Sequence, residues 1–334
     1  MKEAEQQSND SNWPKDYFGQ SEVFAQYWWL VPVVAAFLTT LLLPTISRMK
    51  PRRQVIAYCA QDQVYAESIF HDFEKQTGIK VRAVFDSEAV KTVGLANRLL
   101  AERSHPQCDV FWGNEEMRTR QMAAQDVFRE TNGWAAFGYR SRRIVINTNL
   151  LQLASAPHSL LELTNAHWRG KVALAYPQFG TTGTHFHALR QHWGAELWEN
   201  WCRSLAANKP LIVDGNSVVV KLVGKGEASI GLSDSDDIAE GQDNSLPIMP
   251  LPINEETLLI PNTVGIIRNA PHPEPAEKLF DFLRRPEVAE RLIAAKALEG
   301  KSMAGTMPTL KPDWNALLHD LEPVTAKLNQ IFLR

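Results

Sequence analysis

The sequence predicts an α/β fold divided into two lobes. Between Val55 and Glu116, short apolar runs alternate with segments whose apolar residues recur at helical spacing, which indicates strand, helix, strand, helix and strand. Polar side chains collect where these strands end, as they do at the ligand-binding edge of open α/β sheets. The 334 residues exceed the usual size of one hydrophobic core, and we therefore expect two lobes.

The first part of the predicted sheet has three strands, at residues 55–59, 79–85 and 109–112. Apolar spacing predicts helices near residues 66–73 and 89–100, and Gly78 is typical of a helix end. Each strand leads into polar residues that are candidate ligand contacts, although such residues also cap ordinary helices. They are Gln61 and Asp62, Ser87 and Glu88, and Asn114 and Glu115.

The second part begins with predicted strands at residues 142–147 and 172–175, and the loop 178–185 (QFGTTGTH) follows. Glycines and threonines between a strand and a helix can direct N–H groups and hydroxyls toward an anion, and the helix N-terminus adds a favourable potential. An ordinary glycine-rich turn explains the loop equally well. The candidate contacts here are Gly180, Thr181, Thr182, Thr184 and His185. The predicted helix runs to Gly194.

Two further segments contain candidate contacts. Residues 214–217 (DGNS) open a predicted helix and place Asn216 and Ser217 where caps or ligand donors belong. The predicted strand 228–232 ends in a cluster of three carboxylates, Asp234, Asp236 and Asp237. Carboxylates this close repel one another unless a metal, an amine or helix N–H groups offset the charge.

The end of the chain is predicted to return to the first lobe through a strand at residues 258–267, which contains a further candidate contact, Asn262. Amphipathic helices are expected at 275–283 and 288–298, and a final helix at about 317–332.

Several long segments together resemble one known family. They read FHDFEKQTGIKV, KTVGLANRLLAE, PQCDVFWGNEE, YRSRRIVINTNLL, SLLELTNAHWRGKVALAYPQFGTTGTH, GEASIGLSDSDD and IPNTVGIIRNAPHPEPAEKLFDFL. They resemble the extracellular solute-binding proteins of ABC importers, in the group that contains ferric-iron, thiamine and aminoethylphosphonate binders. The resemblance covers roughly Val55 to Leu298 and leaves residues 1–50 outside.

The resemblance implies a two-lobed periplasmic-binding-protein-like fold of type II, with two crossover strands at a hinge. It also implies that a small solute is held between the lobes by their closure, with an ABC permease as partner. The expected divisions are a polar tail (1–26), a membrane anchor (27–46), a basic linker (47–54), lobe 1 (55–141), lobe 2 (142–257) and a return to lobe 1 with C-terminal helices (258–334).

The chain departs from its iron-binding relatives where they carry two adjacent tyrosines whose phenolates hold ferric iron. Here the matching residues are Ser233–Asp237, and no two of the six tyrosines are adjacent. Carboxylate oxygens could still accept a divalent cation. Glu115, Asp234 and Asp236 are the candidate ligands. No cofactor is expected other than such a metal.

Residues 27–46 form an uncharged apolar segment at about the 20-residue length that spans a bilayer as a helix. Acidic residues precede it, which is unlike a cleaved secretory signal. The basic residues that follow it would place the main domain in the cytoplasm under the positive-inside rule. The family resemblance favours the opposite orientation, with the domain in the periplasm or extracellular space, and we adopt it.

Composition excludes some classes of protein. The net charge is −3, without a dense basic stripe, so we expect no nucleic-acid partner. Cys59, Cys108 and Cys202 are odd in number. The first two are expected at opposite ends of neighbouring strands, roughly 13 to 16 Å apart and beyond the roughly 7 Å limit for a disulfide. Buried free thiols are predicted.

The leading hypothesis is a membrane-anchored solute-binding protein, not an enzyme. The 180–184 loop would hold an anionic group, while Asp234, Asp236 or Glu115 would hold a cationic one. A zwitterion such as an aminoalkylphosphonate fits both, and a metal with a bridging anion fits nearly as well. The alternatives are a metal-dependent hydrolase that uses Asp234, Asp236 and Asp237, or a tethered ligand sensor. The sequence contains none of the common hydrolase motifs.

Overall fold

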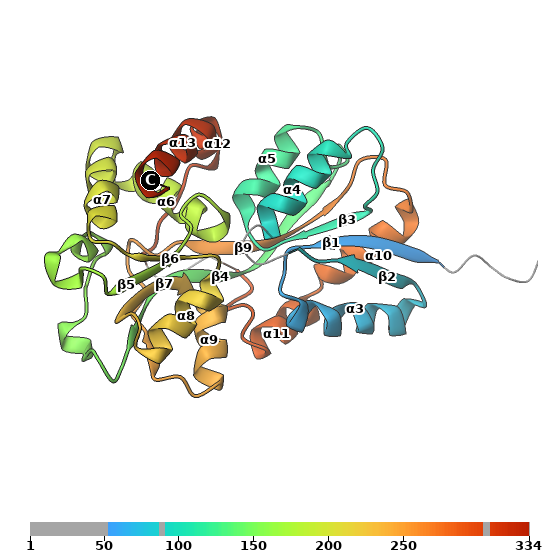
Figure 1. Cartoon of the computed structure of the whole chain (residues 1–334). Coiled ribbons are helices and arrows are strands. Elements are labelled where there is room, and N and C mark those ends of the chain that lie inside the picture. Colours follow the sequence, from blue (N-terminus) through green and yellow to red (C-terminus); the bar gives the residue numbers. More distant parts are fainter. Residues whose placement is uncertain (1–52, 87–90, 303–307, 334) are drawn as a thin grey trace, which may run out of the picture. The chain divides into compact units, whose positions relative to one another are not determined.

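The computed structural model describes residues 53–86, 91–302 and 308–333 (Figure 1). The predicted membrane anchor at 27–46, and the candidate contacts Ser87 and Glu88, lie outside the described residues. None of the helices in the described ranges combines the length and the hydropathy that crossing a membrane requires.

The described strands join in one mixed sheet, ordered β2-β1-β3-β9-β4-β7-β5-β6, with β8 paired to β4. The strands are β1 (Gln54–Cys59), β2 (Lys80–Val84), β3 (Val110–Gly113), β4 (Trp134–Asn147), β5 (Val172–Ala175), β6 (Leu211–Val213), β7 (Ile230–Asp234), β8 (Ile248–Pro250) and β9 (Leu259–Ile266). We call β1–β3 and the helices beside them the first half, and β5–β8 with theirs the second half.

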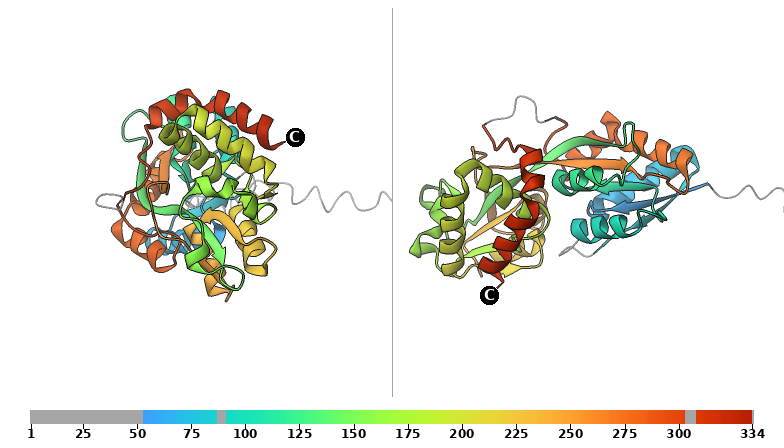
Figure 2. Two further views of the ribbon diagram at one scale, coloured as in Figure 1. Left: turned by 90° about the vertical axis from the view of Figure 1, so that its left-hand side faces the viewer. Right: turned by 90° about the horizontal axis from the view of Figure 1, so that it is seen from above.

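The helices cover both faces of each half (Figures 1 and 2). They are α3 (Gln63–Thr77), α4 (Lys91–Ala101), α5 (Glu116–Ala124), α6 (Gly180–Trp193), α7 (Ala195–Ala207), α8 (Asn216–Lys225), α9 (Ser235–Asp243), α10 (Pro273–Leu283), α11 (Pro286–Ala294), α12 (Trp314–His319) and α13 (Leu321–Phe332). Three short 3₁₀ helices lie at Leu153–Ser155, Leu160–Thr164 and Ala166–Trp168.

Alternate residues of each strand face opposite layers, because the side-chain period of a strand is two. In the first half, Ala57 and Cys59 of β1 face the core formed with α3, α10 and α11, whereas Tyr58 faces the core formed with α4 and α5. In the second half, Ile144 of β4 faces the layer of α6, α7 and α13, and Val145 faces α8 and α9. Each half is therefore a three-layer α/β structure.

Two long strands connect the halves. Residues 134–141 of β4 pair with β9, and residues 142–146 pair with β7. The register of β4 and β9 shifts between Phe137 and Tyr139, at Gly138, whose φ is +59°. Glycine tolerates this left-handed backbone, and a Cβ here would also lie 2.5 Å from a Leu298 methyl group. The two strands that the resemblance assigned to a hinge thus lie side by side between the halves (Figure 2).

Most predicted elements are confirmed, and several boundaries differ. The loop predicted at 178–185 is mostly helical, because α6 begins at Gly180, and the helix predicted at 288–298 ends at Ala294. The strand predicted at 142–147 begins at Trp134, so the expected lobe boundary at residues 141 and 142 falls inside β4. The predicted final helix divides at Asp320 into α12 and α13. Pro323 has no N–H to donate to the carbonyl of His319, which prevents one continuous helix. All three cysteines are buried and none forms a disulfide, as predicted.

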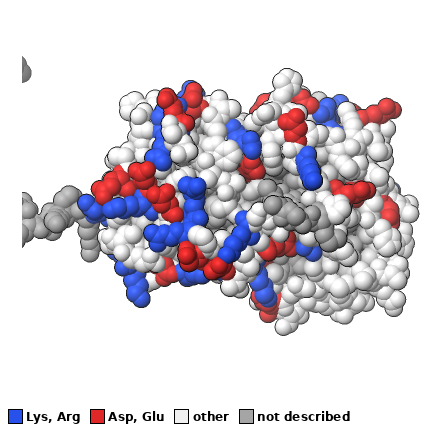
Figure 3. Space-filling view, turned by 180° about the vertical axis from the view of Figure 1, so that it is seen from behind, with Lys and Arg blue, Asp and Glu red and all other residues white. Residues whose placement is uncertain are grey.

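Charged side chains on the surface are interspersed. On the face shown in Figure 3, Lys and Arg lie next to Asp and Glu. Exposed ion pairs of this kind include Arg268 with Asp126 and Glu130, and Lys278 with Glu274. Exposed pairs contribute little to stability, typically below about 1 kcal/mol.

Candidate functional site

A cleft cavity of about 60 Å³ lies where the loops of the two halves meet. Most of its lining comes from the second half, and Asp62, Val93 and Asn114 come from the first. The residues from the second half and from β4 are Arg140, Ala175, Tyr176, Phe179, Gly180, Thr181, Thr182, Asp214, Gly215, Asn216, Asp234, Asp236 and Asp237. The cavity is thus formed by residues on both sides of the crossover strands.

The N-termini of α6 and α8 reach this cavity without side-chain caps. The residue before α6 is Phe179 and the residue before α8 is Gly215, and neither side chain caps its helix. The first N–H groups of an α-helix lack partners within the helix, and the helix dipole makes this end positive. Two uncapped N-termini beside one cavity form a favourable position for an anion.

Buried arginines lie beside the aspartates. Arg142 on β4 is directly opposite Asp234 on β7, and its Nη1 donates to the Asp234 carboxylate at 2.7 Å. The guanidinium group of Arg140 lies 3.2 Å from Asp234 and 3.0 Å from Asp236. All four of these charged side chains are almost fully buried. The aspartates are therefore partly neutralised within the protein.

Polar side chains from α6 and α8 complete the network around Asp234. The Thr181 hydroxyl donates to Asp234 at 2.8 Å, and the Asn216 amide donates to the same carboxylate at 3.2 Å. The Asn216 side-chain oxygen accepts from Arg142 at 2.7 Å and from the Thr182 hydroxyl at 3.3 Å. This network fixes the starts of both helices relative to the end of β7.

The three carboxyl groups differ in their proton affinity. Burial would raise the pKa of Asp234, but Arg142 and Arg140 outweigh burial and hold this pKa below its ordinary value. Burial raises the pKa of Asp236 to about 7, with Asp234 and Asp62 adding to the shift and Arg140 opposing it. Burial and the charges of Asp236 and Asp234 raise the pKa of Asp237 well above its ordinary value.

Two buried polar atoms of the cavity residues have no hydrogen-bond partner in the described part of the chain. They are Oδ1 of Asp236 and Nε of Arg140. Unpaired buried polar atoms are rare because burial without a partner is unfavourable by about 1–3 kcal/mol. The Asp236 oxygen can accept a hydrogen bond from a bound group, and the Arg140 N–H can donate one.

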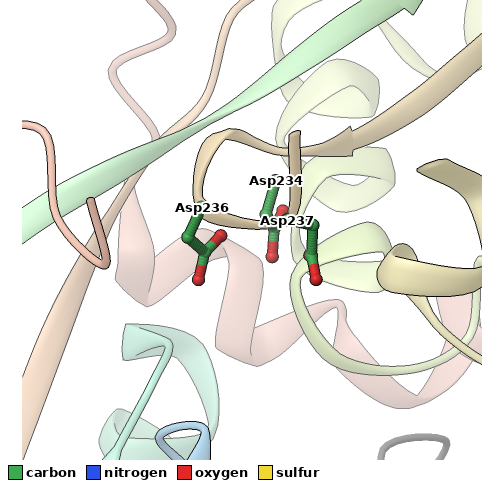
Figure 4. A group of neighbouring side chains, drawn as sticks. All are labelled: Asp234, Asp236 and Asp237. Atoms are coloured by element: carbon green, nitrogen blue, oxygen red, sulfur yellow. The ribbon is translucent and has the colours of Figure 1, made fainter. Parts of the chain in front are cut away.

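The structure gathers nine of the candidates predicted from the sequence around the cavity. They are Asp62, Asn114, Gly180, Thr181, Thr182, Asn216, Asp234, Asp236 and Asp237. Figure 4 shows the carboxyl groups of the last three pointing to the same side of the turn between β7 and α9. The sequence did not indicate Arg140, Tyr176, Phe179 or Asp214 as cavity residues. The spacing of Arg140 and Arg142, two apart on a strand, was the available signal for a shared face.

The other described candidates have contacts away from the cavity lining. Glu115 caps α5 by accepting from the N–H groups of Met117 and Arg118, and the Thr184 hydroxyl also donates to it. Gln61 and Asn262 hydrogen bond to each other at 2.8 Å. His185 lies 2.7 Å from the carbonyl of Glu256. Ser217 does not line the cavity either.

The carboxylates of Asp234, Asp236 and Asp237 can bring ligand oxygens within 4.8 Å of one another, close enough to share a cation. Oxygen ligands of this kind suit Ca²⁺ or Mg²⁺. However, Asp234 is already paired with two guanidinium groups, and Asp236 is paired with one. The positive charges of these arginines oppose a further cation at the same carboxylates, and they oppose a divalent ion more strongly than a monovalent one.

Known proteins resemble this chain in sequence. A family model described as bacterial extracellular solute-binding protein matches residues 55–295. An Fe(3+)-binding periplasmic protein of Serratia marcescens is 30% identical over 196 residues, which is 53% of this chain and 56% of that protein. A putative 2-aminoethylphosphonate-binding periplasmic protein of Salmonella paratyphi A is 25% identical over 250 residues, 69% of this chain and 72% of that protein.

Solved structures share the fold. Iron-bound HitA from Pseudomonas aeruginosa superposes with a TM-score of 0.74 at 18% identity, covering 84% of this chain and 99% of that one. AfuA from Actinobacillus pleuropneumoniae, solved with fructose-6-phosphate, gives a TM-score of 0.72 at 16% identity, covering 84% and 99%. The fold is therefore the mixed α/β fold of periplasmic binding proteins. The match over residues 55–295 establishes that the chain belongs to the bacterial extracellular solute-binding protein family.

Proposed function

We propose that this protein is the solute-binding component of an ABC importer and that it holds a small zwitterionic solute in the cleft cavity. The main observation in support is that one cavity is bordered both by groups that suit an anion and by a group that suits a cation. The uncapped N-termini of α6 and α8 offer N–H groups to an anion. Asp236 offers an unpaired carboxylate oxygen to an ammonium group.

An aminoalkylphosphonate has both charges at a short separation, and one relative is named for 2-aminoethylphosphonate. Its phosphonate would lie at the start of α6, near Gly180, Thr181 and Thr182, and its ammonium group beside Asp236 and Asp237. An ammonium ion beside a carboxylate favours the ionised form. Binding would therefore lower the pKa of Asp236 from about 7.

Ferric iron is the solute named for another relative. Among the described tyrosines, Tyr176 lines the cavity, and the charge of Asp236 acts on Tyr65. Burial and the charges of Asp236 and Glu240 raise the pKa of Tyr65 above its ordinary value, so its phenolate forms less readily than that of an ordinary tyrosine. A divalent cation with a bridging anion remains the second candidate, because the three carboxylates lie within reach of one ion.

The proposal includes a membrane anchor at residues 27–46 with the binding domain in the periplasm or extracellular space, and delivery of the solute to a permease. The uncharged 20-residue segment supports an anchor, and the relatives named periplasmic support the location. The proposal assigns no catalytic role to the aspartates, because these relatives are named as binding proteins.

Isothermal titration calorimetry of the full chain tests the proposed ligand. We expect 2-aminoethylphosphonate to bind stoichiometrically, and ethylphosphonate, which lacks the amine, to bind at least tenfold more weakly, equivalent to about 1.4 kcal/mol. Asp236→Asn should remove most of this preference. Glu240→Gln is the matched control, because Glu240 is an exposed residue of the same helix. Equal binding of the two phosphonates would contradict the proposed role of Asp236, and tight binding of a divalent metal alone would favour the second candidate.

A further inference from the structure

A second cavity, of about 380 Å³, lies on the second half of the fold and shares no lining residue with the cleft cavity. Its lining combines the aliphatic side chains of Ile144, Leu160, Leu232 and Leu251 with buried polar residues. These are Arg142, His185, Glu256 and Thr257. Ile144 and Leu232 lie on the face of β4 and β7 that packs toward α6. We call this space the aliphatic cavity.

The size of the aliphatic cavity is sufficient for a small organic molecule. An engineered protein cavity of about 150 Å³ with a lining of leucine, isoleucine and phenylalanine accepts benzene. The aliphatic cavity is larger, at about 380 Å³. It can therefore hold a six-membered ring with a substituent.

His185 lines the aliphatic cavity and has a hydrogen-bond acceptor without a partner among the described residues. Its Nε2 lies 2.7 Å from the backbone carbonyl of Glu256, and since a carbonyl only accepts, Nε2 carries the proton. Burial and the charge of Arg142 lower the pKa of His185 to about 3, so the imidazole is neutral at ordinary pH. Its Nδ1 therefore has a lone pair, and this buried atom has no partner in the described residues.

Arg142 adds a donor without leaving an unbalanced charge. Two of its nitrogens bond to Asp234, Asn216 and the carbonyl of Leu232, and its charge is balanced by Asp234 at 2.7 Å. Its Nε is buried and has no partner among the described residues. The Glu256 carboxylate, which also belongs to the lining, already accepts from the Ser159 hydroxyl at 2.8 Å and from the Leu160 N–H at 2.6 Å.

We propose that the aliphatic cavity is a second ligand site, which binds a small, uncharged and mostly apolar molecule through one hydroxyl or N–H group that donates to Nδ1 of His185. The aliphatic walls bury the apolar part of the molecule, at roughly 25 cal/mol per Å² of apolar surface removed from water. We expect the ligand to be uncharged, because Asp234 already balances the charge of Arg142 and burial of an unpaired charge is strongly unfavourable. This inference does not depend on the solute of the cleft cavity.

The test uses phenol as the probe, with anisole as its matched analogue without a donor, and the full chain with ¹³C-labelled methyl groups. We expect saturable phenol binding that shifts the methyl signals of Ile144 and Leu232, and at least tenfold weaker binding of anisole. Ala156→Phe places a ring into the aliphatic cavity from its lining. This variant should weaken phenol binding at least tenfold.

Leu197→Phe is the control, because it adds a comparable ring at an exposed position of α7. It should bind phenol as the unmodified chain does. Three results would each overturn the proposal: no saturable phenol binding, anisole bound as tightly as phenol, or methyl shifts confined to residues outside the aliphatic cavity. The methyl shifts of the unmodified chain decide the question if Ala156→Phe does not fold.

Discussion

At the scale of single residues, the chemistry of the cleft depends on how a few charges are paired. Arg142 and Arg140 neutralise Asp234, while Asp236 keeps one unpaired oxygen. The sequence showed the three aspartates but not which one is available. Which aspartate is available depends on the pairing of Arg142 on β4 with Asp234 on β7. These residues are 92 positions apart, so the local sequence gives no signal of their contact.

The pH dependence of stability should report on Asp236. Its pKa is about 7 in the folded protein and close to its ordinary value of about 3.9 when unfolded. The folded state then binds more protons, so the contribution of this group is fully present below about pH 4 and is lost as the pH rises through 7. We expect the melting temperature of the ligand-free protein to fall from pH 5.5 to pH 8.

Asp236→Asn should reduce that fall, because asparagine resembles the protonated carboxyl group and does not titrate. Differential scanning calorimetry of both proteins measures the two slopes. Glu240→Gln, an exposed change in the same helix, should keep the slope of the unmodified chain. Identical slopes for the unmodified chain and Asp236→Asn would contradict the raised pKa.

Thr182 is a proposed contact for the anionic group at the start of α6. Thr182→Val removes the hydroxyl but keeps the shape of the side chain, so we expect affinity for 2-aminoethylphosphonate to fall more than threefold, equivalent to roughly 0.7 kcal/mol. Calorimetric titration measures the change, and Thr148→Val at an exposed position is the control. An affinity within threefold of the unmodified chain would remove Thr182 from the contacts.

At the scale of elements, the strands and helices of the second half were largely predictable from the sequence. The contacts at the helix ends that border the cavity were not. The strand 172–175 and the end of α6 at Gly194 follow from apolar periodicity and from the glycine. The start of α6 does not, because the helix begins at Gly180, inside the loop predicted at residues 178–185. The side chain of Phe179, the residue before α6, does not cap the helix, and the Thr181 hydroxyl bonds instead to Asp234 on a distant strand. The local sequence does not indicate that contact. The same uncapped end makes the helix available to a ligand.

The early start of β4 was missed for a related reason. Residues 134–141 are only partly buried and include Gly138 and Arg140, which weaken an apolar strand pattern. Charged residues are normally exposed. The burial of Arg140 and Arg142 depends on partners that the local sequence does not contain.

Arg142→Met should destabilise the second half. The substitution leaves Asp234 with fewer compensating contacts in a buried position, and loss of one partner of a buried ion pair costs about 3 kcal/mol or more. Arg143→Met is the matched control on the next residue of β4. Arg143 pairs near the surface with Glu299, and we expect a change below about 1 kcal/mol. Urea denaturation followed by circular dichroism measures both, and equal effects would contradict the account of the network.

At the scale of the whole molecule, β4 and β9 connect the two halves, and the cavity receives residues from both. The order of elements and the family could be predicted from the sequence, because the resemblance to extracellular solute-binding proteins extends over long segments of the chain. The sequence could not predict which candidates meet in the cavity. Gln61, Glu115 and Asn262 follow strands or lie on them, as Asp234 does, but they form their hydrogen bonds elsewhere.

If ligand draws the halves together about these strands, the radius of gyration should fall on binding. Small-angle X-ray scattering of the full chain, with and without saturating 2-aminoethylphosphonate, measures this change. Asp236→Asn at the same solute concentration should show a smaller decrease. A radius of gyration unaffected by bound ligand would contradict closure.

The central claim is that the cleft holds a small organic solute through Asp236. The most direct test is native mass spectrometry of the full chain, purified without added metals or chelators, combined with elemental analysis of the same sample. The account predicts one small anionic or zwitterionic molecule per chain, and its loss from Asp236→Asn. A stoichiometric metal ion in place of that molecule, or the same molecule retained at equal occupancy by Asp236→Asn, would contradict it.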